Sequence, residues 1–290
     1  MADTKTNDAL ARIQARAHEA QVKQEEKAVE TPQQMFLPGL EEFMRAMPNH
    51  IARSSLFAPV ARGRKRMLKD TVLVSRADAE IRFWGEQLDE AQADVWMQAM
   101  HEATKQPLGT AVVITRGAFL KSIGRTTGKN DYEWLHRSME SLAFAMLVIE
   151  VKKPDGKPKL AIGKTRALHL IDGFDYDDEA EAYTLRIDPR WHGLYGNREF
   201  ALIDWDKRLQ IGRGQDMAKA LQRLVATSGE MVQRYALDWL KSKLEYGSPL
   251  RKFRESLEAA MHELERLEII AAGRIETNSK GKLQAVWTKL

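Results

Sequence analysis

The sequence predicts an α+β protein with two domains, each a helix-turn-helix followed by a β-hairpin. Its 290 residues suit two domains of about 100 to 150 residues each. Apolar residues recur at helical spacing in two separate stretches, and strand-like runs around a polar turn follow each of them. Since a helix-turn-helix with a hairpin is the outline of a winged helix, we expect two tandem winged-helix domains preceded by a flexible N-terminal tail.

The part of the chain before Asp70 is expected to lie outside both domains. Residues 1–30 are polar, with too few large apolar side chains to form a core, and predict a flexible tail. Residues 31–69 combine short apolar clusters with four prolines and predict a linker that carries docking and basic segments. The basic residues of its second half are Arg53, Arg62, Arg64, Lys65, Arg66 and Lys69. The first domain is then expected at 70–203 and the second at 204–290.

The first domain is expected to open with a β-hairpin and to continue into three helices. The expected elements are an extended pair at 71–75 and 80–84, a helix capped by Asp89, a strand at 110–115, a short helix at 118–123 and a helix from Asn130 or Asp131. A hairpin that turns at Asp155-Gly156 follows this helix-turn-helix and carries Lys157 and Lys159. This hairpin is the predicted wing.

The second domain repeats the outline more clearly. Asp216 is a predicted helix cap, and a second helix is expected over 235–246, where Gly247 ends it. Ser248 and Pro249 form a favoured N-cap and first-turn pair for a third helix. Its predicted buried stripe is Phe253, Leu257, Met261, Leu264 and Leu267. Apolar runs at 269–276 and 282–288 predict a closing hairpin around 277–281.

Basic residues gather where a winged helix would meet DNA. A helix that enters the major groove contacts bases and phosphates from its first two turns, which carry the positive end of the helix dipole. The DNA-binding candidates are Ser248, Arg251, Lys252, Arg254, Lys280 and Lys282 in the second domain and Lys129, Asn130 and Arg137 in the first. The alternative is that these are solvated charges on amphipathic helices, since the 248–267 helix also carries four glutamates.

Several classes of activity are excluded by composition or spacing. The chain has no cysteine, so disulfides and thiolate chemistry are impossible. The loop from Gly124 to Asn130 lacks the spacing of a phosphate-binding loop, and His262-Glu263 lacks the second histidine of a zinc protease. We assign no site to the acidic run 172–181. No catalytic residue, metal or cofactor is expected, and the lack of a signal peptide or membrane-spanning run predicts a cytoplasmic protein.

One segment resembles a known family. Met44-Arg45-Ala46-Met47-Pro48-Asn49, followed by Ala52-Arg53-Ser54-Ser55-Leu56-Phe57, is similar to the segment before the first winged helix of TrfA replication initiators from broad-host-range plasmids. The resemblance implies binding of iteron repeats in double-stranded origin DNA, melting of an adjacent AT-rich region with contact to single-stranded DNA, and a role in plasmid copy control. It further implies the host helicase and chromosomal initiator as partners, and leaves open a monomer–dimer equilibrium.

The same resemblance implies a peptide for the host sliding clamp. The residues that match are Gln33, Gln34, Met35, Phe36 and Leu37. A glutamine amide would anchor the peptide, and the three apolar side chains would fill the clamp pocket; alternatively, they pack on the protein's own core. Two other functions stay open from the residues: a winged-helix repressor that binds an operator, and a nicking or nucleotide-hydrolysing enzyme.

Overall fold

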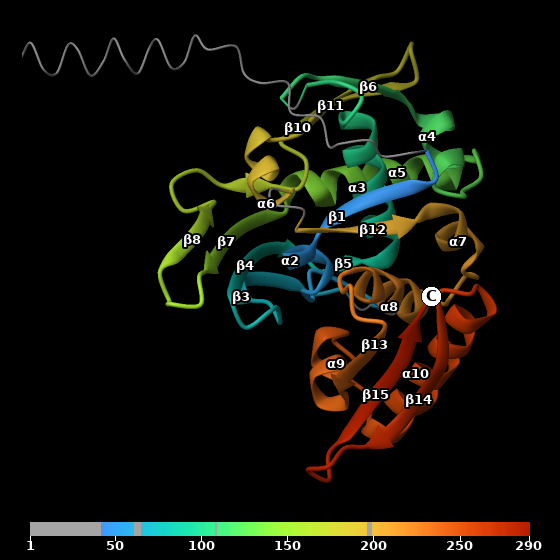
Figure 1. Ribbon diagram of the computed structural model, residues 1–290. Helices are drawn as coiled ribbons and strands as arrows, with labels where there is room; N and C mark the ends of the chain where they lie inside the picture. Colours follow the sequence, from blue (N-terminus) through green and yellow to red (C-terminus); the bar gives the residue numbers. More distant parts are fainter. Residues whose placement is uncertain (1–41, 61–64, 108, 196–198) are drawn as a thin grey trace, which may run out of the picture. The chain divides into compact units, whose positions relative to one another are not determined.

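A computed structural model describes residues 42–60, 65–107, 109–195 and 199–290 (Figure 1). The buried apolar residues fall into two clusters, one that ends at Trp205 and one that begins at Ile211. We call the elements from Met44 to Asp204 the first lobe and those from Asp216 to Lys289 the second lobe; helix α7 (Trp205–Gln210) joins them. The predicted α+β class and the two winged helices are confirmed. The predicted tail at 1–30 and the clamp peptide at 33–37 lie outside the described residues.

The winged helix of the first lobe uses strands that are far apart in sequence. Its three helices are α3 (Glu90–Ala103), α4 (Arg116–Ser122) and α5 (Lys129–Phe144), with β6 (Val112–Thr115) between the first two. The wing is the antiparallel hairpin β10 (Gly173–Asp177) and β11 (Ala182–Arg186), since β11 pairs with β6. Asp89 caps α3, as predicted, and the structure adds a full capping box in which the side chain of Gln92 bonds back to the backbone of Asp89.

Three strands of a separate sheet lie along the chain between α5 and this wing. Strands β7 (Met146–Lys152) and β8 (Pro158–Ile162) form the hairpin predicted to be the wing, with Lys157 and Lys159 on it. They join β3 (Met67–Val72), β4 (Ala79–Glu86) and β9 (Leu168–His169) in a five-stranded sheet. The assignment of the wing was therefore wrong, because the strand that pairs with β6 comes only after this sheet is complete.

The segment predicted to be a linker is partly core. Strand β1 (Met44–Pro48) pairs with β12 (Phe200–Asp204), and β2 (Phe57–Ala58) pairs in parallel with β5 (Leu88–Asp89). Between them lies the short helix α2 (Asn49–Ala52), whose Ile51 is fully buried. Prolines 48 and 59 do not prevent this, because Pro48 ends a strand and Pro59 follows one.

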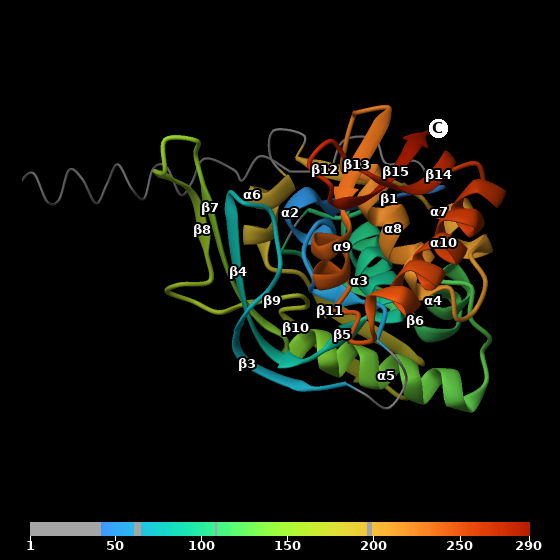
Figure 2. The ribbon, with the colours of Figure 1, turned by 90° about the horizontal axis from the view of Figure 1, so that it is seen from below.

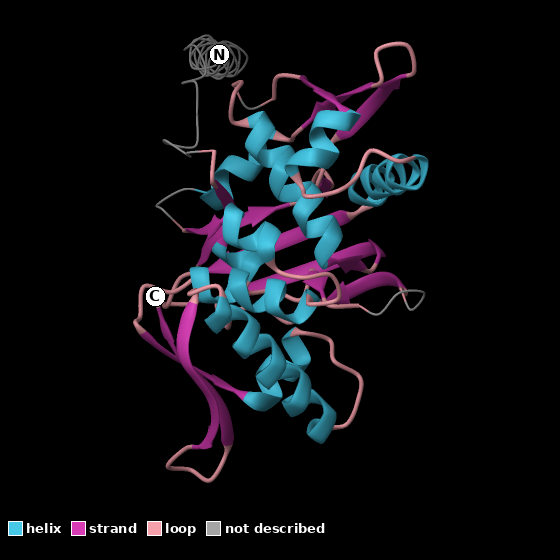
Figure 3. Ribbon diagram, turned by 90° about the vertical axis from the view of Figure 1, so that its right-hand side faces the viewer, coloured by secondary structure: helices cyan, strands magenta, loops and turns pink. Residues whose placement is uncertain are grey.

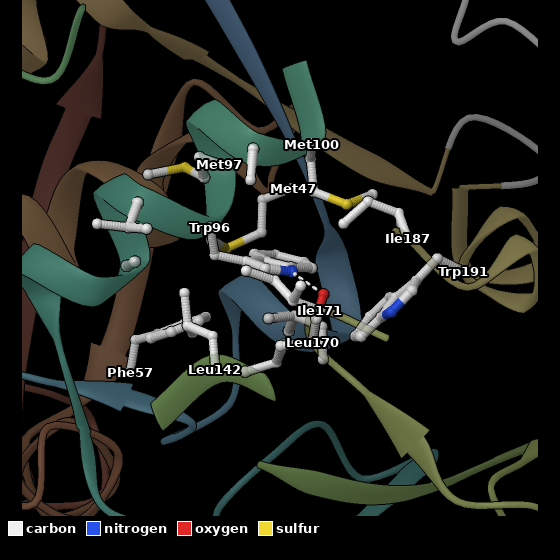
Figure 4. Close-up of a cluster of buried hydrophobic side chains, with 14 of the residues drawn as sticks. Met47, Phe57, Trp96, Met97, Met100, Leu142, Leu170, Ile171, Ile187 and Trp191 are labelled. Atoms are coloured by element: carbon white, nitrogen blue, oxygen red, sulfur yellow. Dashed lines mark hydrogen bonds between the residues drawn. The ribbon is translucent and has the colours of Figure 1, made fainter. Parts of the chain in front are cut away.

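Aromatic side chains from distant segments meet in the core of the first lobe (Figure 4). The ring of Trp96, on α3, lies 5.8 Å from that of Phe57 and 5.0 Å from that of Trp191. Its indole N–H donates to the carbonyl of Leu170 at 3.0 Å. Trp191 comes from a short 3₁₀ helix (Pro189–Trp191) that leads into α6 (His192–Tyr195). These contacts fasten residues 44–58 and 189–195 onto the helices of the first lobe.

The second lobe follows its predicted order, with shifted boundaries. Helix α8 (Asp216–Ala226) is followed by β13 (Val232–Ala236), α9 (Leu237–Lys243), α10 (Leu250–Arg266), β14 (Ile270–Thr277) and β15 (Leu283–Lys289). Tyr235 lies in a strand, not in the predicted helix, because β13 pairs with β15. The predicted stripe of α10 is buried, and the hairpin that follows extends beside the helices (Figure 2 and Figure 3).

Within the described residues, we find no helix with the length and apolar character needed to cross a membrane.

Candidate nucleic-acid interface

The N-terminal end of α10 presents exposed cationic side chains. Lys252 and Arg254 are exposed, and Arg251 is 78% exposed while it pairs with Glu255 one turn later at 2.7 Å. Among the described residues, none in the first turn of α10 is acidic and none caps it with a side chain. The positive end of the helix dipole and the exposed cations therefore coincide, which favours an anionic ligand such as a phosphate.

The turn before α10 is held to the helix by one aromatic residue. The hydroxyl of Tyr246 lies 2.9 Å from the hydroxyl of Ser256 and donates to the carbonyl of Lys252 at 3.3 Å. The ring of Tyr246 packs on Phe253, with 5.2 Å between centroids. Ser248 is half-buried in this turn, and the N-cap is Pro249 instead of Ser248. The predicted cap was thus one residue early, and Ser248 precedes the helix.

The second wing ends in a compact basic turn. The side-chain oxygen of Asn278 accepts the backbone N–H groups of Lys280 at 2.9 Å and Lys282 at 3.0 Å. Gly281 supplies the positive φ, 74°, that closes the turn. Lys280 and Lys282 are both exposed. A backbone fixed in this way presents two lysines at the tip of the hairpin, where a winged helix contacts the sugar-phosphate backbone.

The candidates of the first lobe lie along α5. Lys129 is 89% exposed and 4.0 Å from Glu133, Asn130 is exposed, and Arg137 is exposed two turns further on. A cavity of about 840 Å³ separates this helix from the wing. The cavity is lined by Arg116, Lys129, Tyr132, Glu133, His136, Arg137, Tyr176, Asp178 and Tyr183. The structure thus brings Lys129 and Arg137 to one groove.

The wing of the first lobe is acidic where that of the second is basic. Its turn consists of Asp178, Glu179, Ala180 and Glu181, next to Asp177 at the end of β10. Glu181 forms an ion pair with Arg116, whose guanidinium also lies 4.2 Å from the centre of the Tyr132 ring. Burial raises the pKa of Tyr183 to about 12, so this phenol stays neutral at the base of the groove. Such a wing repels phosphates, and DNA contact by this lobe would depend on α5.

Sequence reasoning missed several residues that line this groove. Arg116, Tyr132 and Tyr176 were not singled out, because their proximity depends on the pairing of β6 with β11. These two strands are separated along the chain by α4, α5 and the strands β7 to β10. The register places Tyr183 opposite Ile114. Local patterns carry no signal for such a pairing, although the aromatic spacing of Tyr176 and Tyr183 marks a hairpin.

The described residues hold no group of three or more His, Asp or Glu side chains placed to bind a metal ion. The acidic run at 172–181 belongs to the wing hairpin, where Asp177 accepts the backbone N–H groups of Glu179 and Ala180. Its carboxylates therefore shape a turn.

The fold defines this chain as a protein with two winged helices in tandem, the second with a basic helix end and a basic wing. Among the solved structures with a similar fold are the following two. Domains 2 and 3 of RctB match with a TM-score of 0.53 at 12% identity, over 84% of this chain and 98% of that one. The Pi initiator protein, in a complex with iteron DNA, matches with a TM-score of 0.50 at 15% identity, over 69% of this chain and 94% of that one. No family model and no curated protein matches the sequence.

Proposed function

We propose that this protein is a replication initiator that binds iteron repeats in double-stranded origin DNA and has no catalytic activity of its own. The observation that carries the proposal is the second lobe, in which the uncapped basic end of α10 and the lysines of the wing tip belong to one winged helix. The similar fold of an initiator crystallised on iteron DNA supports the same assignment.

The charges of the two lobes indicate which DNA contacts each lobe would make. Arg251 or Arg254 of α10 suits bidentate contact with guanine, while Lys252, Lys280 and Lys282 suit phosphates. In the first lobe, Lys129, Asn130 and Arg137 would contact the backbone from α5 without help from the acidic wing. The second lobe would then supply most of the sequence preference.

A gel-shift titration with the direct repeats that flank the gene tests this function. We expect binding of the repeats at least about 1,000-fold tighter than of scrambled DNA at moderate salt, the usual lower range for a specific DNA-binding protein. Equal affinity for both would refute the proposal. When supercoiled plasmid is incubated with the protein, magnesium and ATP, we expect no nicking of the DNA and no hydrolysis of ATP. Either reaction would show that the protein is an enzyme.

The finer steps of initiation are part of the same proposal. By the resemblance to TrfA initiators, the bound protein would open an AT-rich region and recruit the host helicase, and the peptide at 33–37 would bind the sliding clamp. Replacing Phe36 and Leu37 by Ala should abolish plasmid maintenance and leave repeat binding unchanged. If the protein were instead a winged-helix repressor, the same two substitutions should have no effect on plasmid maintenance.

A further inference from the structure

Charged side chains from both lobes are buried together where the lobes meet. Glu90, in the first turn of α3, and Arg208 of α7 are both 0% exposed, and their side chains lie 3.0 Å apart. Arg223 of α8, also 0% exposed, forms a second ion pair with Glu90. One carboxylate of the first lobe is therefore shared by a guanidinium of the connecting helix and one of the second lobe.

The cluster continues one helical turn further along α3. Asp94 accepts from the Nε of Arg208 and pairs with Lys219 of α8 at 2.6 Å. We call Glu90, Asp94, Arg208, Lys219 and Arg223 the interlobe joint. Burial alone would raise the pKa of Asp94, but the positive charges of Arg208 and Lys219 outweigh it and hold this pKa below its usual value. The carboxylate of Asp94 is thus ionised at neutral pH.

The guanidinium groups also bind the backbone of both lobes. Arg223 donates to the carbonyl of Phe57, in β2 of the first lobe, at 3.0 Å. Arg208 donates to the carbonyl of Lys219, in α8, at 3.0 Å. Bidentate, backbone-anchored guanidinium contacts have a narrow range of geometries, unlike apolar contacts, which tolerate sliding. The joint therefore fixes an orientation as well as an attachment.

Two further contacts fasten the helix-turn-helix of the second lobe to the first lobe. The Nζ of Lys243, at the end of α9, donates to the carbonyl of Ser54 at 3.2 Å and is fully buried. Glu245, in the turn before α10, pairs with Arg66 at 3.0 Å and accepts a bond from Gln87. The turn that positions the basic end of α10 is thus held by residues of the first lobe that precede its winged helix.

We propose that the interlobe joint sets the separation and relative rotation of helices α5 and α10, so that the protein accepts only one spacing between the two halves of its DNA site. This inference rests on the proposed function for its DNA consequence, while the rigidity of the joint is a property of the protein alone. Glu90 is the positioning residue, since it is the carboxylate that both arginines share. Its proposed role is in spacing, because its carboxylate is fully buried and paired with both arginines.

The rigidity is tested by spin labels in the full chain. The sequence has no cysteine, so Lys153→Cys on the β7–β8 turn and Ser279→Cys on the second wing give one labelled pair. We expect one narrow distance distribution, and a width at least about twofold greater after Glu90→Gln, which removes the charge at constant shape. A broad distribution in the unsubstituted chain, or an unchanged width in the variant, would overturn the proposal.

A matched control separates the joint from buried ion pairs in general. Asp188, whose side chain is 2% exposed, pairs with Arg190 at 2.5 Å inside the first lobe, so Asp188→Asn should leave the label distance unchanged. If Glu90→Gln does not fold, Lys219→Gln removes only the edge of the joint, because its side chain is 17% exposed. This variant should broaden the distribution as well, and equal widths would again count against the joint.

The effect on DNA binding is measured with two DNAs: the repeat whose halves are located by footprinting, and the same repeat with two extra base pairs between its halves. The insertion rotates one half by about 70° against the other. Loss of simultaneous engagement should weaken the unsubstituted protein by about 100-fold and the Glu90→Gln variant by less than about tenfold. Equal penalties would refute the spacing role. A protein without any preference for the repeat would refute the proposed function, and the spin labels would still decide whether the joint is rigid.

Discussion

The carboxylate of Glu90, in the first lobe, is bonded to the guanidinium of Arg223, in the second, and both side chains are fully buried. A buried ion pair adds little net stability over an apolar pair, but the loss of one partner leaves an uncompensated charge. The two lobes are therefore coupled in folding as well as in geometry.

Glu90→Gln should lower the free energy of unfolding by about 3 to 5 kcal/mol, because Arg208 and Arg223 would stay buried without their shared counterion. Urea denaturation measures this. Glu150→Gln, which removes a partly exposed pair with Lys164, should cost about 1 kcal/mol or less. Similar losses of unfolding free energy in both variants would show that the burial of Glu90 does not make its ion pairs more important for stability than a surface pair.

Met47→Ala should lower the free energy of unfolding by about 2 to 5 kcal/mol, because Met47 is fully buried in the core of the first lobe. Met67 provides the control: its side chain is 67% exposed, so Met67→Ala should change the free energy by less than about 0.5 kcal/mol. A thermal or urea melt of each variant is sufficient. Equal, small effects would mean that residues 44–58 are a linker after all.

This last prediction concerns the part of the fold that sequence reasoning placed wrongly. Helical spacing and caps located α3, α5 and α10, because those signals are local. The roles of Met47 in β1 and of the hairpin around Gly156 depend on the pairing of β1 with β12 and of β7 with β4, and in both cases the partner strand is distant in sequence. Prolines 48 and 59 suggested a linker, although both stand at strand ends.

The same distinction applies to the candidate interface. Arg251, Lys252 and Lys280 were identifiable from sequence, since a helix start and a hairpin tip are local features, and the structure leaves all three exposed. The acidic wing of the first lobe was not identifiable from sequence, because its strands are recognised as a wing only through the pairing of β11 with β6. The joint residue Arg223 was also missed, since a single arginine on an apolar helix face resembles a surface residue in the sequence.

Stability should depend on pH through Lys243, whose pKa burial and the nearby Arg223 lower to about 7 from a usual 10.5. Between these values the unfolded chain holds a proton that the folded protein has lost, so stability rises with pH across this window and falls towards pH 7. At about 1.4 kcal/mol per pH unit, the free energy of unfolding changes by on the order of 5 kcal/mol across the whole window.

Lys243→Met should remove this dependence. The difference in unfolding free energy between the variant and the unsubstituted protein should then shrink steadily from pH 6.5 to pH 9.5, measured by urea denaturation at three values. Lys241→Met, two residues earlier on α9 and only half-buried, is the control and should keep the original slope. If Lys243→Met keeps it too, the amine is not the titrating group.

Arg251→Ala should weaken binding of the repeat by about 1 to 3 kcal/mol and relax preference at one base pair, provided that Arg251 contacts a guanine. Its pair with Glu255 must open for this contact, and that pair is exposed and weak. Glu255→Ala is therefore an informative companion, which should leave affinity equal or raise it. Affinity that Arg251→Ala does not change would place this side chain away from the DNA.

The two wings should respond oppositely to neutralisation. Lysines at phosphates release counterions, so Lys280→Ala with Lys282→Ala should reduce the slope of log affinity against log salt by about two and weaken specific and scrambled DNA alike. Asp178→Asn on the acidic wing should instead raise affinity for both DNAs, because it removes a repulsion. Gel shifts at four salt concentrations measure both effects. A general charge effect would shift every DNA by net charge alone. Lys153→Ala with Lys157→Ala on the β7–β8 hairpin therefore completes the comparison, because this pair removes the same two charges from a sheet that is not a wing. An equal change in slope there would show that the second wing does not touch the duplex.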